Sequence, residues 1–531
     1  MCVIPTGLEH QSRQLASISR LAHHDHRAAF VKLALLVPGH QLAERDVDRL
    51  LDVPRFPLVG LSDVDDLHLL SLLVQFFRVI HRHKLYRCYR PPYVADLPES
   101  SVPPRRRPGS VIRGLAVDIT PLRRSRDFRI LWFGQLVSNT GRQITVVALP
   151  YQIFVQTRSP LAVGLIGLVE VAPLIIATIG GGAIADRVDR RKLLLVTEIG
   201  LAATSGLFVA GAMAGHPPLW YLYAVTGLQA GIYGLNTPAR SAAVPNLVPR
   251  EQLAAAIALG QVLFNTTMIV GPAIAGLILA RFGLTWAYAA DVISFTASFA
   301  TVLAIQPLPP QREEANAPAS PWQEIKDGFT YLKRKRVLVS TFLVDLDAMI
   351  FGMPRALFPV LALTVFRVGP RGLGFLYAAP AAGALVAAAT AGWVGQVRHQ
   401  GRAVIWAVAL WGAAITGFGL SGRLFGLALL FLFVAGDADV ISAVFRGAIL
   451  QLSVPDSLRG RLSAVHIMVV TGGPRLGDFE AGGVAALVSP WFSVVSGGVA
   501  CVLGVVALAR AFPELARYHA DAALPGRAIE P

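Results

Sequence analysis

Long apolar stretches dominate this chain of 531 residues, and from residue 130 onward they follow one another with only short polar turns between them. A helix needs about 20 apolar residues to cross a bilayer, and only helices and closed barrels can satisfy every backbone hydrogen bond there. The chain is 54% hydrophobic and only 15% charged, whereas a soluble domain carries about 25% charged residues. The sequence therefore predicts an all-α integral membrane protein.

Twelve apolar spans can be counted in the sequence. They cover residues 130–155, 161–185, 193–213, 219–235, 253–280 and 284–305, and then 337–365, 372–397, 403–420, 424–450, 462–488 and 491–509. We therefore expect twelve transmembrane helices in two six-helix bundles, at residues 125–306 and 337–511. A polar linker at 307–336 should join the bundles in the cytoplasm, and residues 512–531 should form a cytoplasmic tail.

Residues 1–124 differ from the rest of the chain, because they are rich in His and Arg and show no sustained periodicity. Their most apolar piece, residues 67–80, is too short to span a bilayer. We expect a poorly ordered N-terminal extension. One interpretation is a misassigned start, upstream of the start that the cell uses.

The distribution of basic residues predicts how the helices are oriented. The net charge is +15, and most Lys and Arg lie in the linker, the tail and the turns after spans two, four, eight and ten. Positive charge marks the cytoplasmic loops of membrane proteins. We therefore expect a multi-pass protein of the cytoplasmic membrane with both termini in the cytoplasm, and we expect no nucleic-acid partner.

The two sets of spans repeat a pattern, which indicates two pseudo-symmetric halves. Arg240 stands nine residues before Pro249, and Arg446 stands nine residues before Pro455. A second matched pair is Gly271-Pro272 and Gly473-Pro474. One such match could arise by chance, but several in the same order favour an internal duplication.

The turn between spans two and three is short and strongly charged. Its residues at Gly182, Asp186, Arg187, Asp189, Arg190 and Arg191 resemble the signature Gly-x-x-x-Asp-Arg-x-Gly-Arg-Arg of major facilitator superfamily transporters. Asp189 stands where that signature has its second glycine. The resemblance implies that Asp186 and the arginines form a latch between the two halves on the cytoplasmic side. Positive-inside charge alone would explain the basic residues but not this spacing.

Span five carries a second signature. Gly271, Pro272 and Gly276 resemble the fifth-helix motif of the superfamily's antiporters, although Thr267 and Ala275 replace two of its glycines. The resemblance implies export by antiport. The alternative is a kinked packing helix, because Pro removes a backbone donor and Gly allows helices to approach closely.

Charges inside a membrane span are costly, so each is a functional hypothesis. We predict proton coupling at Glu170, Asp345 and Asp347, and a cavity or gate role for Arg142, Gln143, Asp439 and Arg446. Further intramembrane charges are Asp437, Arg475, Asp478 and Glu480. The alternative for each is a charge that only pairs across helices and fixes their packing. For Asp291 and Arg355 this packing role is favoured.

Longer stretches sharpen the resemblance. Residues 342–359, 374–379, 454–464 and 472–482 resemble the enterobactin-exporter-like branch of the superfamily. This implies two six-helix bundles that alternate access to a central cavity, and proton-driven export of a small molecule, either a siderophore or an amphipathic drug. We expect a monomer in the lipid bilayer. A facilitator or importer of a metabolite is the alternative within the transporters.

A membrane enzyme or sensor is the alternative outside the transporters. The sequence shows no clustered nucleophile and base, no metal-ligand set and no Gly-x4-Gly-Lys-Ser/Thr phosphate loop. The cysteines Cys2, Cys88 and Cys501 lie far apart and indicate neither a disulfide framework nor a metal site. We therefore expect no enzyme activity, no cofactor and no metal.

Overall fold

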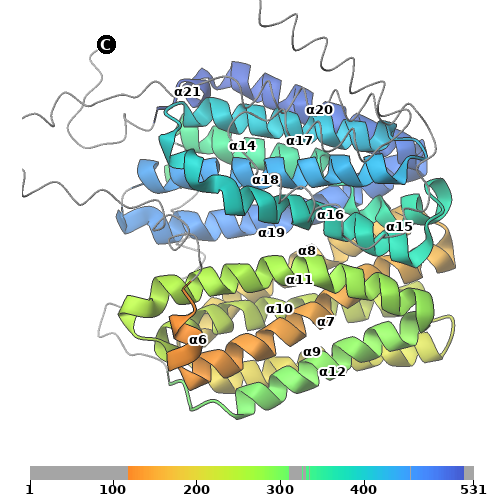
Figure 1. The fold of residues 1–531 in the computed structure, drawn as a ribbon, viewed down its shortest axis with the longest axis vertical. Coiled ribbons are helices and arrows are strands. Elements are labelled where there is room, and N and C mark those ends of the chain that lie inside the picture. The colour runs from red at the N-terminus through yellow and green to blue at the C-terminus, as the bar shows by residue number, and fades with distance from the viewer. Residues whose placement is uncertain (1–117, 310–325, 327–329, 334, 455, 520–531) are drawn as a thin grey trace, which may run out of the picture. The chain divides into compact units, whose positions relative to one another are not determined.

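The computed structural model describes residues 118–309, 326, 330–333, 335–454 and 456–519 (Figure 1). Within these residues the chain consists of helices and turns, and no strand occurs. They all belong to one compact unit that begins at Arg106. The predictions for the N-terminal extension, for Cys2 and Cys88, and for most of the linker fall outside the described residues.

The first half begins with α6 (Thr120–Arg124) and continues with six long helices. These are α7 (Arg126–Thr157), α8 (Pro160–Ala185), α9 (Arg190–Met213), α10 (Leu219–Leu247), α11 (Leu253–Arg281) and α12 (Gly283–Leu303), with the short 3-10 helix η3 (Arg250–Gln252) before α11. Side chains cap three of the helix starts. Ser125 accepts a hydrogen bond from Phe128 N, Ser159 from Ala162 N and Asp189 from Arg191 N, which satisfies amide groups that the helices leave free.

The second half also supplies six spans, in more pieces. They are α14 (Arg336–Phe351) with η4 (Arg355–Leu357), α15 (Phe358–Val360) and the π-helix η5 (Leu361–Val365); α16 (Gly369–Thr390) with the 3-10 helix η6 (Ala391–Gln396); α17 (Gln400–Leu420); α18 (Phe425–Ser453); α19 (Asp456–Leu487); and α20 (Pro490–Ala511), followed by α21 (Pro513–Ala516). Helices therefore occupy all twelve expected spans, and the predicted all-α membrane fold is confirmed.

Nine of the helical segments in the described residues are long and apolar enough to cross a membrane by length and composition. The other three, α7, α10 and α19, are 32, 29 and 32 residues long. Their polar side chains lower their hydropathy. In α7, for example, Ser138, Gln143, Thr145 and Gln152 are all buried. These three helices carry much of the polar interior described below.

Two spans differ from the prediction. The fourth was expected to end at residue 235, but α10 continues to Leu247 through Pro238 and Pro245. The seventh was expected to be continuous, but it breaks after α14, at Gly352, Met353 and Pro354. The indole N–H of Trp411 donates to the Gly352 carbonyl at 2.9 Å. This bond satisfies one of the backbone groups that the break leaves free.

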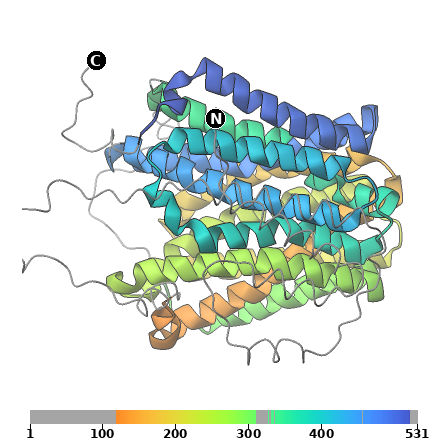
Figure 2. The ribbon, with the colours of Figure 1, turned by 45° about the horizontal axis from the view of Figure 1, so that its top comes forward.

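Each half is held together by helix packing. In the first half α7 packs against α11 and α12, α8 against α10, and α9 against α10 and α12; in the second, α18 packs against α16 and α17, and α17 against α20. The helices run side by side in both Figure 1 and Figure 2. Two pairs, α8 with α19 and α11 with α16, join the halves.

Candidate functional site

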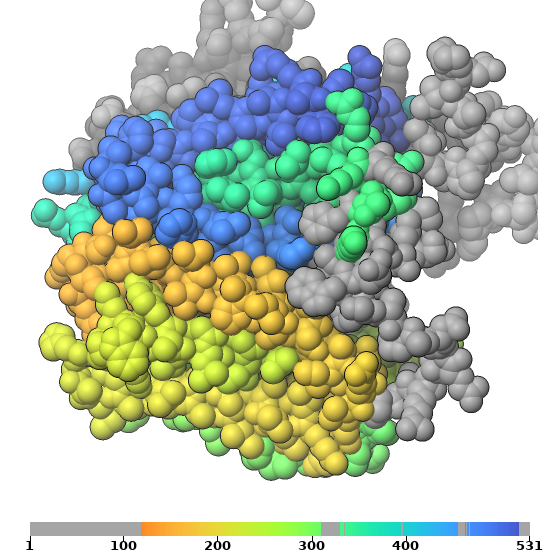
Figure 3. Space-filling model, turned by 180° about the vertical axis from the view of Figure 1, so that it is seen from behind, coloured from red at the N-terminus to blue at the C-terminus, as the bar shows by residue number. Residues whose placement is uncertain are grey.

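Glycines form both helix crossings between the halves. In the α8–α19 crossing, a Cβ added to Gly482 would lie 2.7 Å from the Gly164 Cα, closer than real Cβ contacts. In the α11–α16 crossing, a Cβ on Gly374 would lie 3.2 Å from the Gly276 Cα and 2.5 Å from the Pro272 carbonyl. Figure 3 shows the surfaces of α8 and α19 in contact. Small residues thus let the backbones of the two halves touch.

Both crossings lie at the same end of the bundle, where α8 and α16 begin and α11 and α19 end. Toward the other end of these helices, Gly181 packs against α10 of its own half, and the neighbouring glycines have open space. An added Cβ would meet nothing within 4 Å at Gly180, Gly182 or Gly260, or at Gly392 just after α16. The close approaches between the halves are therefore concentrated at one end.

A central cavity lies between the halves. One part, of about 390 Å³, is lined by residues of α7, α8, α10 and α11 from the first half and of α16 and α19 from the second, with Arg355 and Ala356 of η4. A second part, of about 250 Å³, shares Gln143, Phe264, Met268, Arg355 and Tyr377 with the first. The larger volume lies within the range of about 300–1,000 Å³ that is typical of small-molecule sites.

Charged residues from both halves meet on one wall of this cavity. Glu170 Oε2 of α8 lies 3.3 Å from Arg475 Nε of α19. Nearby, the guanidinium of Arg142 lies 3.6 Å from the centre of the Tyr233 ring, which is a cation–π contact. Arg142, Glu170, Tyr233 and Arg475 all line the cavity. The structure thus brings together two residues that the sequence placed in different roles, Arg142 and Glu170.

The broken seventh span supplies another part of the wall. Asp478 Oδ1 accepts a hydrogen bond from the Ala356 amide at 3.0 Å, and the Tyr377 hydroxyl donates to the Arg355 carbonyl at 3.3 Å. Both Arg355 and Asp478 line the cavity. Asp439, predicted from sequence as a cavity residue, lines the smaller part. Arg355, for which a packing role was favoured, also lines the cavity.

The glycines of the fifth-helix motif let α11 pack closely against two other helices, α7 and α16. A Cβ on Gly271 would lie 2.4 Å from the Gln143 Cβ, so this glycine lets α11 approach α7. The Gln143 amide in turn lies 2.6 Å from the Met268 sulfur and faces the cavity. Gly276 forms the α11–α16 crossing. The motif therefore shapes both the cavity wall and the junction of the halves.

The remaining predicted residues of the second half lie away from the central cavity. Arg446 forms a buried ion pair with Asp345 at 2.7 Å and donates to Ser442 at 3.0 Å. Asp347 lies against α20, where a Cβ on Gly504 would meet its carboxylate. Neither Asp345 nor Asp347 lines the central cavity. Among the described residues no cluster of His, Cys, Asp and Glu could hold a metal ion.

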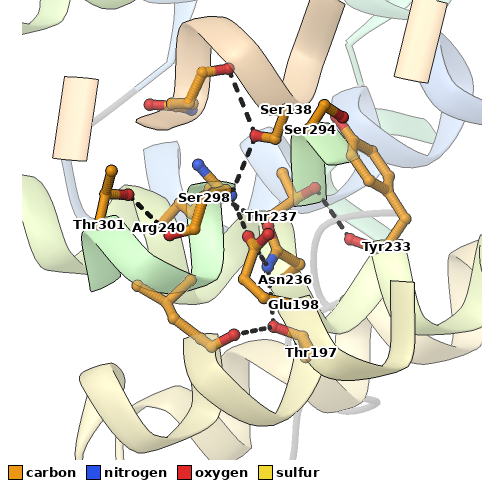
Figure 4. Close-up of polar contacts among 12 residues, drawn as sticks. Ser138, Thr197, Glu198, Tyr233, Asn236, Thr237, Arg240, Ser294, Ser298 and Thr301 are labelled. Atoms are coloured by element: carbon orange, nitrogen blue, oxygen red, sulfur yellow. Dashed lines mark hydrogen bonds and ion pairs between the residues drawn. The ribbon is translucent and has the colours of Figure 1, made fainter. Parts of the chain in front are cut away.

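A buried polar network in the first half was not predicted from sequence (Figure 4). Arg240 of α10 forms an ion pair with Glu198 of α9 and donates to Asn236 at 2.6 Å and to Ser298 of α12 at 3.2 Å. Asn236 also donates to Thr197 at 2.7 Å. The one available signal was Glu198, a single acid within the apolar span 193–213.

The charged turn between α8 and α9 contacts its own half. The Asp189 carboxylate accepts from the Leu308 amide at 3.2 Å, and Arg191 donates to the Leu303 carbonyl at 2.7 Å. Arg190 is buried and donates its backbone amide to the Leu308 carbonyl at 3.1 Å. Asp186 and Arg187 are exposed. The latch between the halves stays a prediction.

Comparison with known proteins identifies this architecture. A model of the family described as transmembrane secretion effector, within the major facilitator superfamily, matches residues 116–527. The chain is 27% identical to "Enterobactin exporter EntS" of Shigella boydii serotype 18 and of Escherichia coli O1:K1, over 74% of this chain and 93% of each relative.

Solved structures agree on the fold. A POT family transporter in complex with 5-aminolevulinic acid superposes with a TM-score of 0.61 at 11% identity, covering 74% of this chain and 97% of that one. A bacterial homologue of the iron transporter ferroportin in an inward-facing state superposes with a TM-score of 0.56 at 16% identity, covering 74% of this chain and 98% of that one. With twelve helical spans in two halves around a shared cavity in its described residues, the chain is a multi-pass membrane transporter, not an enzyme, and belongs to the transmembrane secretion effector family of the major facilitator superfamily.

Proposed function

We propose that this protein exports a small molecule across the cytoplasmic membrane by alternating access, in exchange for protons. The observation that carries the proposal is a cavity lined by both halves, with the close crossings of the halves concentrated at one end. Such a cavity can open to one side at a time if the halves rock about the crossings. The binding site then stays at the centre while access alternates.

The orientation of the cycle follows from the basic residues. If both termini are cytoplasmic, α8 begins on the outer side and ends at the charged turn inside. The glycine crossings then close the outer side, and the cavity faces the cytoplasm, which is the state that loads a substrate for export. The exposed latch residues Asp186 and Arg187 would engage the second half only when the inner side closes.

The wall of the cavity indicates the class of substrate. Arg142, Arg355 and Arg475 supply three positive charges, and Glu170 and Asp478 supply two negative ones. Aromatic side chains also line it, namely Tyr233, Phe264, Tyr377, Phe358 and Trp411. Arginine and aromatic faces suit a substrate with rings and acidic or polar groups. A siderophore of the kind that the enterobactin exporters carry fits this description, and an amphipathic drug is the second candidate.

A transport assay in cells tests the proposal. In a strain that lacks its own exporter but makes enterobactin, expression of this chain should raise secreted enterobactin, and an uncoupler should abolish the increase. The matched control is the Glu170→Arg variant, which places a like charge beside Arg475. Uptake of added enterobactin, instead of release, would favour an importer. Release that persists with the uncoupler would contradict proton-driven export.

A further inference from the structure

Asp291, in the middle of α12, is fully buried, and among the described residues its carboxylate is bonded only by hydroxyl groups. Its Oδ2 accepts from Thr145 Oγ1 at 2.7 Å and from Ser205 Oγ at 2.8 Å. Ser294 Oγ lies 3.4 Å from Oδ1. The hydroxyls come from α7, α9 and α12 itself. No ion pair joins Asp291 to any residue in the described part of the chain.

The absence of an ion pair distinguishes Asp291 from three other carboxylates of the described residues. Glu198, Asp345 and Glu170 each pair with an arginine, so a proton on any of them would leave a cation without its partner, which is costly where the pair is buried. A proton on Asp291 removes a buried charge and strands none. Its hydroxyl partners can donate or accept, and therefore remain bonded to the neutral acid.

A short route connects Asp291 to the central cavity. Thr145 and Gln229 both line a side cavity of about 30 Å³, which shares Glu170 and Arg475 with the central cavity. A cavity needs about 10–15 Å³ of such space to hold a water, so the side cavity has room for one. Gln229 also donates to Ser205 Oγ at 3.2 Å. A single hydroxyl, that of Thr145, thus stands between the side cavity and the Asp291 carboxylate.

The charged and titratable groups around Asp291 are few. From α7, Arg142 acts on it electrostatically. From α12 itself, Tyr288 lies one turn away and donates its hydroxyl to Gln152 at 2.6 Å. On α9 the only acid is Glu198, which is paired with Arg240, and the only charged residue of α11 is Arg281, at its end. Because Arg142 also lines the central cavity, a change of charge at Asp291 acts on the cavity wall.

We propose that Asp291 is the group that binds the coupling proton, through the hydroxyl of Thr145. The Thr145 proton moves to Asp291 Oδ2, where a new O–H bond forms, and a hydronium ion in the side cavity gives its proton to Thr145 Oγ1 and becomes water. The net charge of the site rises by one, because the carboxylate becomes a neutral carboxylic acid. This inference rests on the proposed proton-driven export and names the residue that carries it out.

Purified protein in proteoliposomes tests it, with radiolabelled enterobactin as the probe. Two rates are compared: exchange of enterobactin across the membrane at equal pH, and accumulation driven by an imposed pH gradient. Asp291→Asn should lower gradient-driven accumulation at least tenfold and leave exchange within twofold of wild type. The control Asp118→Asn removes an exposed carboxylate bonded only to Thr120, and should change neither rate. Gradient-driven accumulation at the wild-type rate in Asp291→Asn would overturn the proposal.

An infrared difference spectrum between high and low pH provides a readout that needs no substrate. At low pH the wild type should gain a protonated-carboxyl component in its carbonyl band that Asp291→Asn lacks. A full band in Asp291→Asn would overturn the proposal. If Asp291→Asn does not fold, Thr145→Val is used instead, and proton uptake after a pH jump should be slowed at least tenfold; an unchanged rate would overturn it.

The outcomes also separate this inference from the proposed function. Wild-type protein that exchanges enterobactin but shows no accumulation in response to the pH gradient would overturn proton coupling, and Asp291 as its site with it. Loss of both rates in Asp291→Asn, with the protonated-carboxyl band still present, would assign Asp291 to packing and leave proton-driven export standing.

Discussion

Glu170 and Arg475 stand 305 positions apart in the sequence, yet their side chains form an ion pair at 3.3 Å across the two halves of the protein. Their side chains are 25% and 20% exposed, so the pair faces the cavity and is not sealed in a helix contact. Both residues belong to the helices of the α8–α19 crossing. The pair is therefore positioned to respond to substrate and to the relative movement of the halves.

Reversing these charges tests that position. Glu170→Arg and Arg475→Glu each place like charges face to face, and each should lower export at least tenfold. The double variant restores opposite charges and should recover most of the activity. Partly exposed ion pairs contribute only about 1 kcal/mol to stability, so all three proteins should reach the membrane in normal amounts. A double variant as inactive as the single ones would show that the positions, not the pairing, matter.

The α8–α19 crossing allows a comparison of neighbouring glycines. Gly482→Ala adds a methyl group 2.7 Å from the Gly164 Cα, whereas at Gly483 an added methyl meets nothing within 4 Å. Overpacking of this kind costs about 1–3 kcal/mol. Gly482→Ala should therefore lower the unfolding temperature and the export rate, and Gly483→Ala should change neither. Equal effects of the two substitutions would argue against a tight crossing.

The network around Arg240 should be needed for folding rather than for transport. Glu198→Gln leaves a buried arginine without its charged partner, which costs about 3–5 kcal/mol. We expect a large loss of folded protein, measured by fluorescence-detected size-exclusion chromatography. Asp127→Asn is the control, because the Arg126 side chain of that ion pair is 69% exposed. Normal folding of Glu198→Gln would contradict this assignment.

The sequence predicts the helices better than it predicts their partners. Apolar length determines a span, so α8, α9 and α17 lie within a few residues of their expected bounds. The break at Gly352–Pro354 was missed, because a Pro inside an apolar span is compatible with a continuous helix.

Side-chain pairing depends on rotation and tilt of the helices, which hydropathy does not encode. Asp345 and Asp347 are two positions apart and looked equivalent in sequence. In the structure one pairs with Arg446 and the other faces α20, because residues two apart lie on different sides of a helix. The partner of Glu170, which is Arg475 in the other half, could not be predicted either, because hydropathy does not encode how the helices are rotated and tilted.

The turn before α17 carries a contact between two histidines that we expect to weaken in acid. The His399 and His519 rings lie 4.3 Å apart. Partial loss of water around the His399 ring, and then the charges of His519, Arg402 and Arg398, hold the pKa of His399 below its usual value. Because protonation is then easier in the unfolded chain, this contact is stable above the ordinary histidine pKa and weakens as the pH falls. In a histidine NMR titration, His519→Ala should raise the pKa of His399, and the His216 signal should not change; an unmoved His399 would contradict the contact.

The charged turn between α8 and α9 carries the last prediction. Asp186 is exposed, whereas Asp189 caps α9 and bonds to Leu308. Asp186→Asn should therefore leave insertion and thermal stability unchanged but slow export, because the inner side would no longer be held closed. Asp189→Asn, the neighbouring control, keeps a side chain that can cap α9 but removes a negative charge from the helix N-terminus, and should lower stability by roughly 0.3–1 kcal/mol. Both variants are compared by export rate and unfolding temperature in the same membranes. Normal export by Asp186→Asn would rule out the latch. The basic residues of this turn would then serve only to orient the helices in the membrane.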